Sequence, residues 1–234
     1  MNSSFAMILA KIDSQVKKFD IALKNTWCMY NIGNMELSYE VALRLEDVSE
    51  RITLLTRMLP ACTGNPLAAQ AVDEAMMKAI PVDIGFTREG WFSLRMPMLL
   101  PKKTTGSPAY VRAFLYPAMR DFFVGKTPVR YTDCVLIYRH VYSKSRPERQ
   151  RRDHDNIEIN MVSDIVALYV MEDDGATSCR HYYCSAGGTE ERTEVYVVPY
   201  FDFGRWLEME KGAPDEGVKL YPERTSPTEK DMFK

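Results

Sequence analysis

The first 80 residues carry apolar side chains at three- and four-residue steps, the spacing of one face of an α-helix. One stripe ends before Gly33 and Asn34, a pair typical of the position just past a helix C-terminus. A second stripe runs to Pro60, and a shorter helix is predicted from Pro66 to Ile80. The stripes consist of Phe5, Ile8, Leu9, Ile12, Val16, Phe19, Leu23, Trp27 and Tyr30, and of Leu37, Val41, Leu45, Val48, Ile52, Leu55 and Leu59. The pattern therefore predicts a helical region over residues 1–80 that contains an antiparallel hairpin.

We expect the two stripes to face each other, because most amphipathic helices bury their apolar face within their own chain. The alternative is that this face forms an oligomer seam or binds a partner protein. Both arrangements need the same spacing, so the sequence leaves them open.

Beyond Val82 the pattern changes to short strands and helices. The β-branched and aromatic residues from Arg130 to Tyr142 predict a buried strand, and Gly187-Gly188 predicts a hairpin between the last two strands. The predicted strands are Trp91–Met96, Arg130–Tyr142, Cys179–Cys184 and Thr193–Val198, and the predicted helices are Pro108–Phe123, Asn156–Tyr169 and Phe203–Lys211. The chain is therefore expected to have an α+β fold. Residues 81–199 would form a mixed-sheet domain with flanking helices, and residues 200–234 a short helix and a loose C-terminal tail.

The composition is ordinary for a soluble globular protein, with 46% hydrophobic and 26% charged residues among 234. The net charge of −2 excludes a globally basic protein, so nucleic-acid contact would need a local basic patch. Five cysteines are scattered through the chain, and we expect reduced thiols. No apolar run reaches the ~20 residues of a membrane span or forms the core of a secretory signal. We therefore expect a cytoplasmic protein without a membrane segment.

Two groups of carboxylates flank the helix predicted at Asn156–Tyr169. Asp153 and Asp155 precede it on alternate residues, and Glu172–Asp174 follow it. If residues 151–155 are extended, the first two side chains project to the same side. Carboxylates gathered in this way repel each other unless a hard cation neutralises them, and Mg²⁺ prefers such oxygen ligands. Each group alone has a simpler explanation, a helix cap at Asp155 or Asn156 and an ordinary acidic turn after the helix.

The pattern Asp153-x-Asp155-Asn156, a helix and then Asp173-Asp174 resembles the signature of the RusA-type Holliday junction resolvases, the crossover junction endodeoxyribonucleases. The nineteen-residue step from Asp155 to Asp174 is the spacing of that family. The resemblance covers about residues 91–198, and the helical N-terminus lies outside it.

This resemblance implies a Mg²⁺-dependent endonuclease that hydrolyses phosphodiester bonds in branched or double-stranded DNA. Asp153, Asp155 and Asp174 would be the catalytic, Mg²⁺-binding carboxylates, and Asp173 would be a further metal ligand. The resemblance also implies a RusA-like sheet domain and a homodimer, in which two sites cut opposing strands of a four-way junction.

The chain departs from the family pattern at Ile159, where the family has a lysine four residues after the second aspartate. The neighbours Glu158 and Asn160 supply no positive charge, and the acidic residue later on the helix is displaced by one position, to Asp164. Loss of an electrostatic stabiliser can cost orders of magnitude in rate. Two alternatives therefore remain: a catalytically impaired DNA-binding module, and a protein-interaction module that acts through the helical N-terminus.

A dense basic run that begins at Arg139 precedes the aspartates, and in isolation it would be a solvated loop. Beside a bound metal ion, its side chains would dock backbone phosphates without reading base sequence. The predicted DNA-binding residues are Lys102, Lys103, Lys144, Arg146, Arg149, Arg151 and Arg152.

Other candidate sites have weaker support. Cys179 and His181 would share one face of a strand while Cys184 points away, so we expect buried structural residues rather than a zinc site. His140 lies in an apolar strand and is expected to be a core histidine with satisfied hydrogen bonds. His154 would either contact phosphate or stay exposed. The sequence has no phosphate-binding loop, dinucleotide fingerprint or nucleophile elbow, so we expect no nucleotide cofactor.

Overall fold

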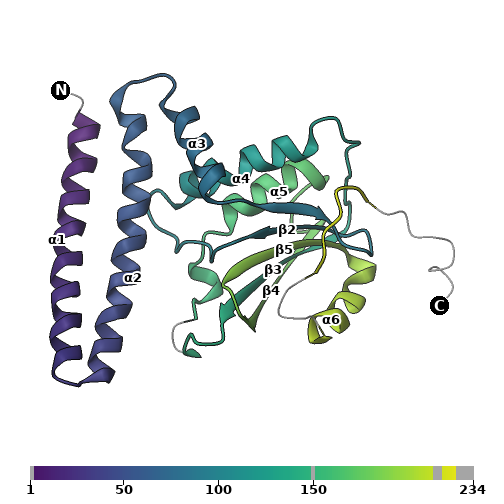
Figure 1. Cartoon of the computed structure of the whole chain (residues 1–234). Helices are drawn as coiled ribbons and strands as arrows, with labels where there is room; N and C mark the ends of the chain where they lie inside the picture. The colour runs from purple at the N-terminus through teal and green to yellow at the C-terminus, as the bar shows by residue number, and fades with distance from the viewer. Residues whose placement is uncertain (1–2, 149–150, 213–217, 225–234) are drawn as a thin grey trace. The chain divides into compact units, whose positions relative to one another are not determined.

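The computed structural model describes residues 3–148, 151–212 and 218–224 (Figure 1). The chain forms two compact units, one from residues 1–75 and 104–110 and the other from residues 76–103 and 111–234. Much of the predicted C-terminal tail, and Arg149 among the predicted DNA-binding residues, lie outside the described residues.

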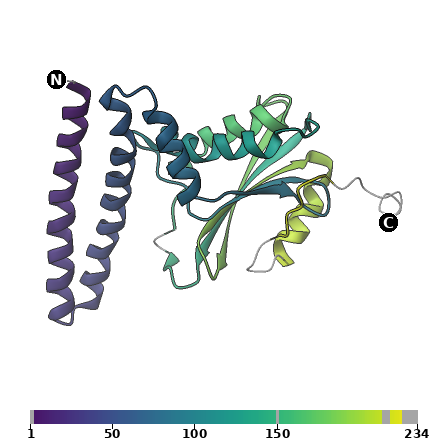
Figure 2. The same ribbon diagram turned by 45° about the horizontal axis from the view of Figure 1, so that its top comes forward.

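The first unit is built on two long helices, α1 (Ser3–Asn31) and α2 (Met35–Met58), which lie side by side as the predicted hairpin (Figure 1, Figure 2). At the turn between them, Gly33 has a φ of 76°. The Asn34 side chain caps α2 by accepting a hydrogen bond from the Leu37 N–H at 3.0 Å. A 3₁₀ turn at Pro60–Thr63 and the start of α3 (Ala68–Ala79) follow. The helical N-terminal region is therefore confirmed.

The apolar stripe of α1 is wider than one neighbouring helix can cover. Ile8 is buried and Phe19 is half-buried, but other members of the stripe remain exposed. The exposed members are Leu9, Val16, Leu23, Trp27 and Tyr30. Burial of the whole stripe against α2 is therefore only partly correct.

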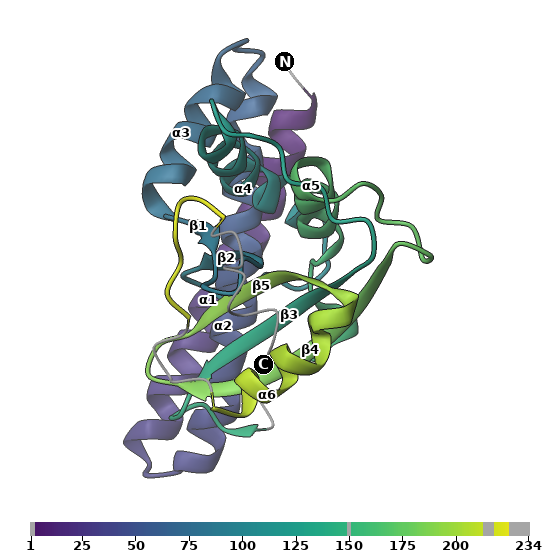
Figure 3. The same cartoon turned by 90° about the vertical axis from the view of Figure 1, so that its right-hand side faces the viewer.

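The second unit is built on a mixed sheet, whose five strands among the described residues have the order β1-β2-β5-β3-β4 (Figure 3). The strands are β1 (Asp83–Phe86), β2 (Phe92–Met96), β3 (Cys134–Ser143), β4 (Cys179–Gly188) and β5 (Arg192–Pro199). β3 and β4 are parallel, and the other neighbouring pairs are antiparallel. The sequence pattern does not reveal β1, because four residues are too few to show a clear alternation.

The hairpin predicted between the last two strands is wrong, because β3 lies between β4 and β5. All of β5 except its last residue is buried, so its backbone needs a hydrogen-bonded strand on each side and finds β2 and β3. In β4 only the first and last residues are buried, which suits an edge strand. The glycines at 187 and 188 therefore end an edge strand and do not connect two paired strands.

Helices cover both faces of this sheet (Figure 2). On one face lie α5 (Asn160–Val170) and α4 (Ser107–Phe123), whose Phe123 ring is 5.9 Å from that of Phe92. On the other face, α6 (Phe203–Gly212) contributes Trp206 to a buried apolar cluster. The predicted α+β class is confirmed. Across the described ranges, no helix has both the length and the apolar content needed to cross a lipid bilayer.

Helix α5 begins at Asn160 and not at Asn156, the predicted start. His154–Asn156 form a single 3₁₀ turn, and Ile157–Ile159 are buried but not helical. The apolar side chains of this segment fit a helical stripe equally well. An isolated β-bridge between Ile157 and Lys102 instead pairs the segment with the chain that follows β2.

The first turn of α5 is capped by a residue other than those considered. Ile159, at the N-cap, has no side-chain acceptor, and the Glu158 carboxylate accepts a hydrogen bond from the Met161 N–H at 3.3 Å. The helix cap considered at Asp155 or Asn156 is therefore wrong. Asp153 and Asp155 both keep exposed side chains.

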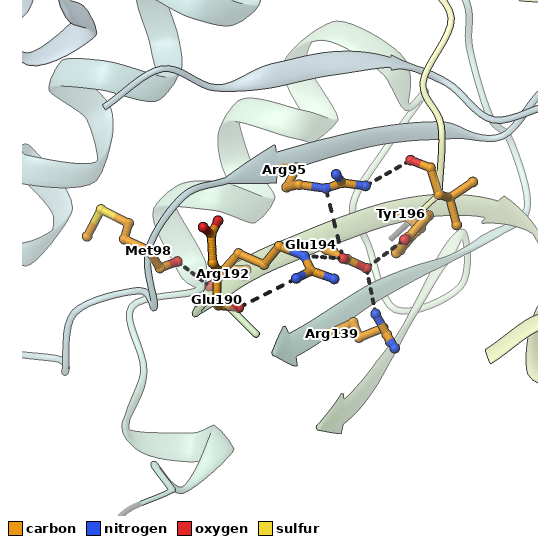
Figure 4. Close-up of polar contacts among 9 residues, drawn as sticks. Arg95, Met98, Arg139, Glu190, Arg192, Glu194 and Tyr196 are labelled. Atoms are coloured by element: carbon orange, nitrogen blue, oxygen red, sulfur yellow. Dashed lines mark hydrogen bonds and ion pairs between the residues drawn. The ribbon is translucent and has the colours of Figure 1, made fainter. Parts of the chain in front are cut away.

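A buried carboxylate, Glu194 on β5, joins three strands (Figure 4). It accepts hydrogen bonds from Arg139 Nη1 at 2.9 Å, from Arg192 Nε at 2.7 Å and from the Tyr196 hydroxyl at 2.7 Å. Arg95 on β2 adds an ion-pair contact of 3.9 Å. Burial alone would raise the pKa of this carboxyl, but Arg139 and the other donors hold it below its ordinary value. One ionised group therefore connects β2, β5 and β3.

Replacement of Glu194 by glutamine is expected to destabilise the fold by about 3–5 kcal/mol at pH 7, because it leaves buried guanidinium groups without their carboxylate. A lowered pKa in the folded state means that this contribution is present above the unfolded value of about 4.3 and is lost as the pH falls through the folded value. The difference in unfolding free energy between wild type and Glu194→Gln should therefore shrink below about pH 4. Urea unfolding at pH 7 and pH 3 measures it.

The matched control is Asp133→Asn, because Asp133 pairs with Arg180 through exposed side chains and should contribute far less to stability than Glu194. An equal loss of stability in both variants at pH 7 would contradict the role given to Glu194.

Candidate functional site

The predicted catalytic segment forms a short turn over the α5 side of β3. We use the name acidic turn for residues 153–156, which comprise Asp153 and the 3₁₀ turn His154–Asn156. The chain that follows β2 holds it through two backbone hydrogen bonds, from Lys103 N–H to the Asn156 carbonyl at 3.0 Å and from Glu158 N–H to the Pro101 carbonyl at 2.9 Å. Because the turn is not extended, the strand alternation assumed for its aspartates does not apply.

On its N-terminal side, the acidic turn is anchored to β3 through Arg152. The Tyr142 hydroxyl accepts a hydrogen bond from the Arg152 N–H at 3.1 Å and donates one to the Arg152 carbonyl at 3.4 Å. The Arg152 guanidinium donates to the Leu100 carbonyl. Contacts on both sides therefore fix the turn on the sheet, as a functional loop requires.

His154 packs inward from the acidic turn, whereas Asp153 and Asp155 on either side of it are exposed. Its ring centroid lies 5.3 Å from that of His140 on β3 and 5.7 Å from that of Tyr183 on β4. His140 is fully buried, and this burial, together with nearby His154, lowers the pKa of the His140 imidazole to about 4. We therefore expect a neutral imidazole at neutral pH.

The buried histidines lack hydrogen-bond partners. Among the described residues, neither ring nitrogen of His140 is hydrogen-bonded, and Nδ1 of His154 is also buried without a partner. The prediction that His140 is a core residue is confirmed, and the prediction that its hydrogen bonds are satisfied is wrong. Buried polar groups of this kind are uncommon and call for an explanation.

The second acidic group, Glu172–Asp174, is exposed and follows α5. A hydrogen bond with Cys179, and then the negative charge of Asp174, raise the pKa of His181 on β4. Cys179 is also hydrogen-bonded to Cys134, its register partner on β3, and this bond lowers the pKa of Cys179 to about 5. Asp174 therefore lies near the end of β4 that carries Cys179.

The two acidic groups lie near different residues of the sheet. His181, which is near Asp174, is four residues from Ser185, the register partner of His140, and this step corresponds to about 13 Å of strand. Within the described residues, no three His, Cys, Asp or Glu side chains form a group that could hold a metal ion. Joint binding of one cation by Asp153, Asp155, Asp173 and Asp174 therefore stays a prediction.

Cationic side chains reach the acidic turn from two separate segments. Lys102 is bridged to Ile157, and Lys103 follows it with an exposed side chain. Arg151 is exposed and lies over the Tyr142 ring at 5.7 Å. The backbone pairing therefore brings the segment of Lys102 and Lys103 next to the acidic turn, and Arg151 precedes this turn along the chain.

The remaining predicted DNA-binding residues differ in their surroundings. Lys144 is exposed just past β3. Arg146 forms an ion pair with Glu191 through contacts of 2.5 and 3.0 Å, which balances much of its charge. Arg139, at the start of the same basic run, is buried against Glu194 and cannot contact DNA. The basic surface is therefore narrower than the sequence suggested.

The surroundings of position 159, where a lysine was expected, favour isoleucine. Ile159 is buried, and its carbonyl accepts a hydrogen bond from the Tyr138 hydroxyl at 3.1 Å. A lysine there would bury its charge, whereas Lys102 and Lys103 bring charge to the turn from a distant part of the chain. The sequence alone could not show this pairing.

Comparison with protein-family models matches residues 1–223 to a family of unknown function, DUF6100. The chain belongs to this family. The matched range includes the whole of residues 91–198, and no RusA family match was found, so the RusA-type assignment is wrong. The DUF6100 model also spans the helical hairpin, which is therefore an integral part of the family and not an addition to a resolvase domain. Searches of curated proteins and of solved structures found no match.

The sequence analysis missed the pairing of His140 with His154 across the face of the sheet. The available indication was weak: a histidine in the middle of a buried strand, and a second histidine in the segment that follows it. Their proximity depends on how the chain after β3 folds back over that strand, and no local spacing encodes this path.

Replacement of Tyr142 by phenylalanine should loosen the acidic turn, because it removes the hydroxyl that bridges both backbone groups of Arg152. Amide hydrogen exchange should increase over residues 152–158, with a loss of about 1 kcal/mol of stability. The matched control, Tyr138→Phe, removes a hydroxyl bonded to Ile159 and Ser163 and should act instead at the start of α5. Identical exchange patterns in the two variants would argue against a local anchor at Tyr142.

Proposed function

We propose that this protein is a Mg²⁺-dependent endonuclease that hydrolyses phosphodiester bonds in DNA, with branched DNA as the substrate to test first. The observation that supports it is the convergence at the acidic turn. Exposed Asp153 and Asp155 lie on a turn whose backbone is paired with the segment of Lys102 and Lys103 and which Arg151 precedes in the chain. Carboxylates next to cations suit a metal ion and a phosphate together.

Asp153 and Asp155, on the acidic turn, are the carboxylates proposed to hold Mg²⁺, whereas Asp174 and Asp173 lie near His181, about 13 Å away along the strand, and are not counted in this set. Mg²⁺ often keeps several waters and binds through only one or two carboxylates, so the ion does not need a ready-made group of three protein ligands. When bound, Mg²⁺ supplies a polarised phosphate oxygen and a more acidic water. The exposed positions of the aspartates leave room for both water and a phosphate.

The basic side chains are proposed to position the DNA backbone. Lys102 and Lys103 would stabilise negative charge at the phosphate. Arg151, Arg152 and Lys144 would extend this contact along the backbone, without selecting a base sequence. A cytoplasmic location, where thiols stay reduced, fits this proposal and the five free cysteines.

Incubation of the full chain with a labelled four-way junction and Mg²⁺ is expected to give strand cleavage. Asp155→Asn should lower the rate by roughly two orders of magnitude, the scale seen when a group that stabilises transition-state charge is removed. Denaturing gel electrophoresis of the labelled strands measures this. Absence of cleavage by the wild type over a range of Mg²⁺ concentrations would overturn the catalytic proposal.

Binding separates the enzyme from a catalytically impaired DNA-binding module. Replacement of Lys102 and Lys103 by glutamine should weaken DNA binding and reduce the slope of log affinity against log salt by roughly 2, one phosphate contact for each lysine. The control is the adjacent pair Lys17 and Lys18 on α1, replaced in the same way. Salt-dependent binding without cleavage would favour the impaired module.

A second candidate function, dimerisation through the hairpin, is favoured by the exposed apolar side chains of α1. Leu9, Val16, Leu23 and Tyr30 are spaced seven residues apart, the repeat by which helices pair in coiled coils and bundles. Near the turn, Leu23, Tyr30 and α2 residues line an apolar groove of about 570 Å³.

A second copy of the chain is the proposed occupant of this face. Four lysines and two aspartates give α1 a net charge of +2, and five acidic and three basic residues give α2 a net charge of −2. Packing of α1 of one copy against α2 of the other would therefore match opposite charges and form a four-helix bundle. The homodimer proposed for the nuclease would use this interface.

Val16→Glu combined with Leu23→Glu should convert the dimer to a monomer, because both charges would enter the seven-residue seam. The control adds the same two charges to α1 at exposed polar positions, as Ser14→Glu with Asn25→Glu, and should stay dimeric. Light scattering after size-exclusion chromatography reports the mass. A monomeric wild type at high concentration would exclude the self-association.

A further inference from the structure

The inference concerns the three buried ring nitrogens at the contact between β3 and the acidic turn. His140 contributes both of its nitrogens and His154 contributes Nδ1, and none has a hydrogen-bond partner among the described residues. His140 is fully buried on the central part of the sheet. A neutral imidazole can complete its bonding with a hydrogen bond or by donating a lone pair to a metal ion.

The separation of the two rings suits coordination of one ion. For two imidazoles on a tetrahedral ion, with metal–nitrogen distances of about 2.0 Å, the ring centroids would lie roughly 5 Å apart. The His140 and His154 centroids are 5.3 Å apart, with the ring planes inclined by 35°. The two rings therefore need no large change in their separation to bind one ion.

We propose that His140 and His154 form a binding site for a divalent transition-metal ion of the Zn²⁺ class. Imidazole nitrogen suits Zn²⁺ and related ions, whereas Mg²⁺ prefers oxygen, so this site differs in metal type from the carboxylate site proposed for Mg²⁺. It goes beyond the proposed nuclease function and does not depend on it.

The remaining coordination positions are open to water or to the neighbouring carboxylates. No third His, Cys, Asp or Glu completes a group with the two histidines in the part of the chain that the structure describes. Asp153 and Asp155 flank His154 and are exposed, so they provide negative charge at the entrance for a cation. Catalytic zinc sites have three protein ligands and one open position, so one of these carboxylates would be the third ligand when the ion is bound.

Titration of the metal-free full chain with Co²⁺, followed by its visible absorption, tests the proposal directly. The wild type should bind one Co²⁺ per chain with a low-symmetry spectrum, and Zn²⁺ should displace it. His140→Leu and His154→Leu should each weaken binding at least tenfold. The control is His181→Leu, which removes the chain's other histidine and should leave the affinity unchanged.

Two results would overturn the proposal. One is a wild type that binds Co²⁺ no more tightly than the double variant His140→Leu/His154→Leu, in which case a bridging water is the better occupant. The other is an unchanged affinity in His154→Leu. This variant alters only the surface turn, so it carries the test even if His140→Leu does not fold. Because the readout is binding, a failure here is distinct from a lack of DNA cleavage.

Discussion

Two consecutive buried residues of β3, Arg139 and His140, set the constraint on which the rest of this structure depends. Side chains alternate along a strand, so the two point to opposite faces of the sheet. Burial of a polar group is costly unless it is bonded. Arg139 is bonded to Glu194 within a network that joins three strands, whereas His140 has no partner among the described residues. The two residues share a strand and are both buried, so the difference between them lies in the side chains of each face: Glu194 beside Arg139, and His154 beside His140.

The Glu194 network lies on one face of the sheet and fixes the position of β3, which contacts the acidic turn on the other face. Because β2, β5 and β3 are connected through one carboxylate, β3 cannot shift in register without breaking buried ion pairs. That fixed strand presents Tyr142 to the backbone of Arg152 and His140 to His154. The sheet therefore fixes the position of the acidic turn. The short path of this turn across the sheet leaves its carboxylates exposed. This division of labour between a stable sheet and a polar loop is common in functional sites.

Local patterns could be predicted from the sequence, and long-range pairings could not. The three- and four-residue spacing from Phe5 onward gave α1 and α2, and the apolar run through Ile137 gave β3. The glycines at the end of β4 were misleading, because a turn-forming pair carries no information about a strand that lies between the two strands it connects. The apolar residues at 157 and 159 match the stripe of a helix, but the segment is paired with Lys102 and is not helical. The aspartates of the candidate site could be named by residue type, but the lysines beside them depend on that pairing.

The error over the family has the same physical origin. Acidic residues at either end of a helix form a short pattern that different folds can produce, and a pattern of carboxylates does not determine its own metal. The DUF6100 match spans 223 residues and includes the hairpin, so the family is defined by features that the acidic pattern does not contain. The residues that distinguish this site from an all-carboxylate one are His140 and His154, whose ring centroids lie 5.3 Å apart. Since nitrogen and oxygen ligands select different ions, the two sites proposed at the acidic turn would differ in the metal that they bind.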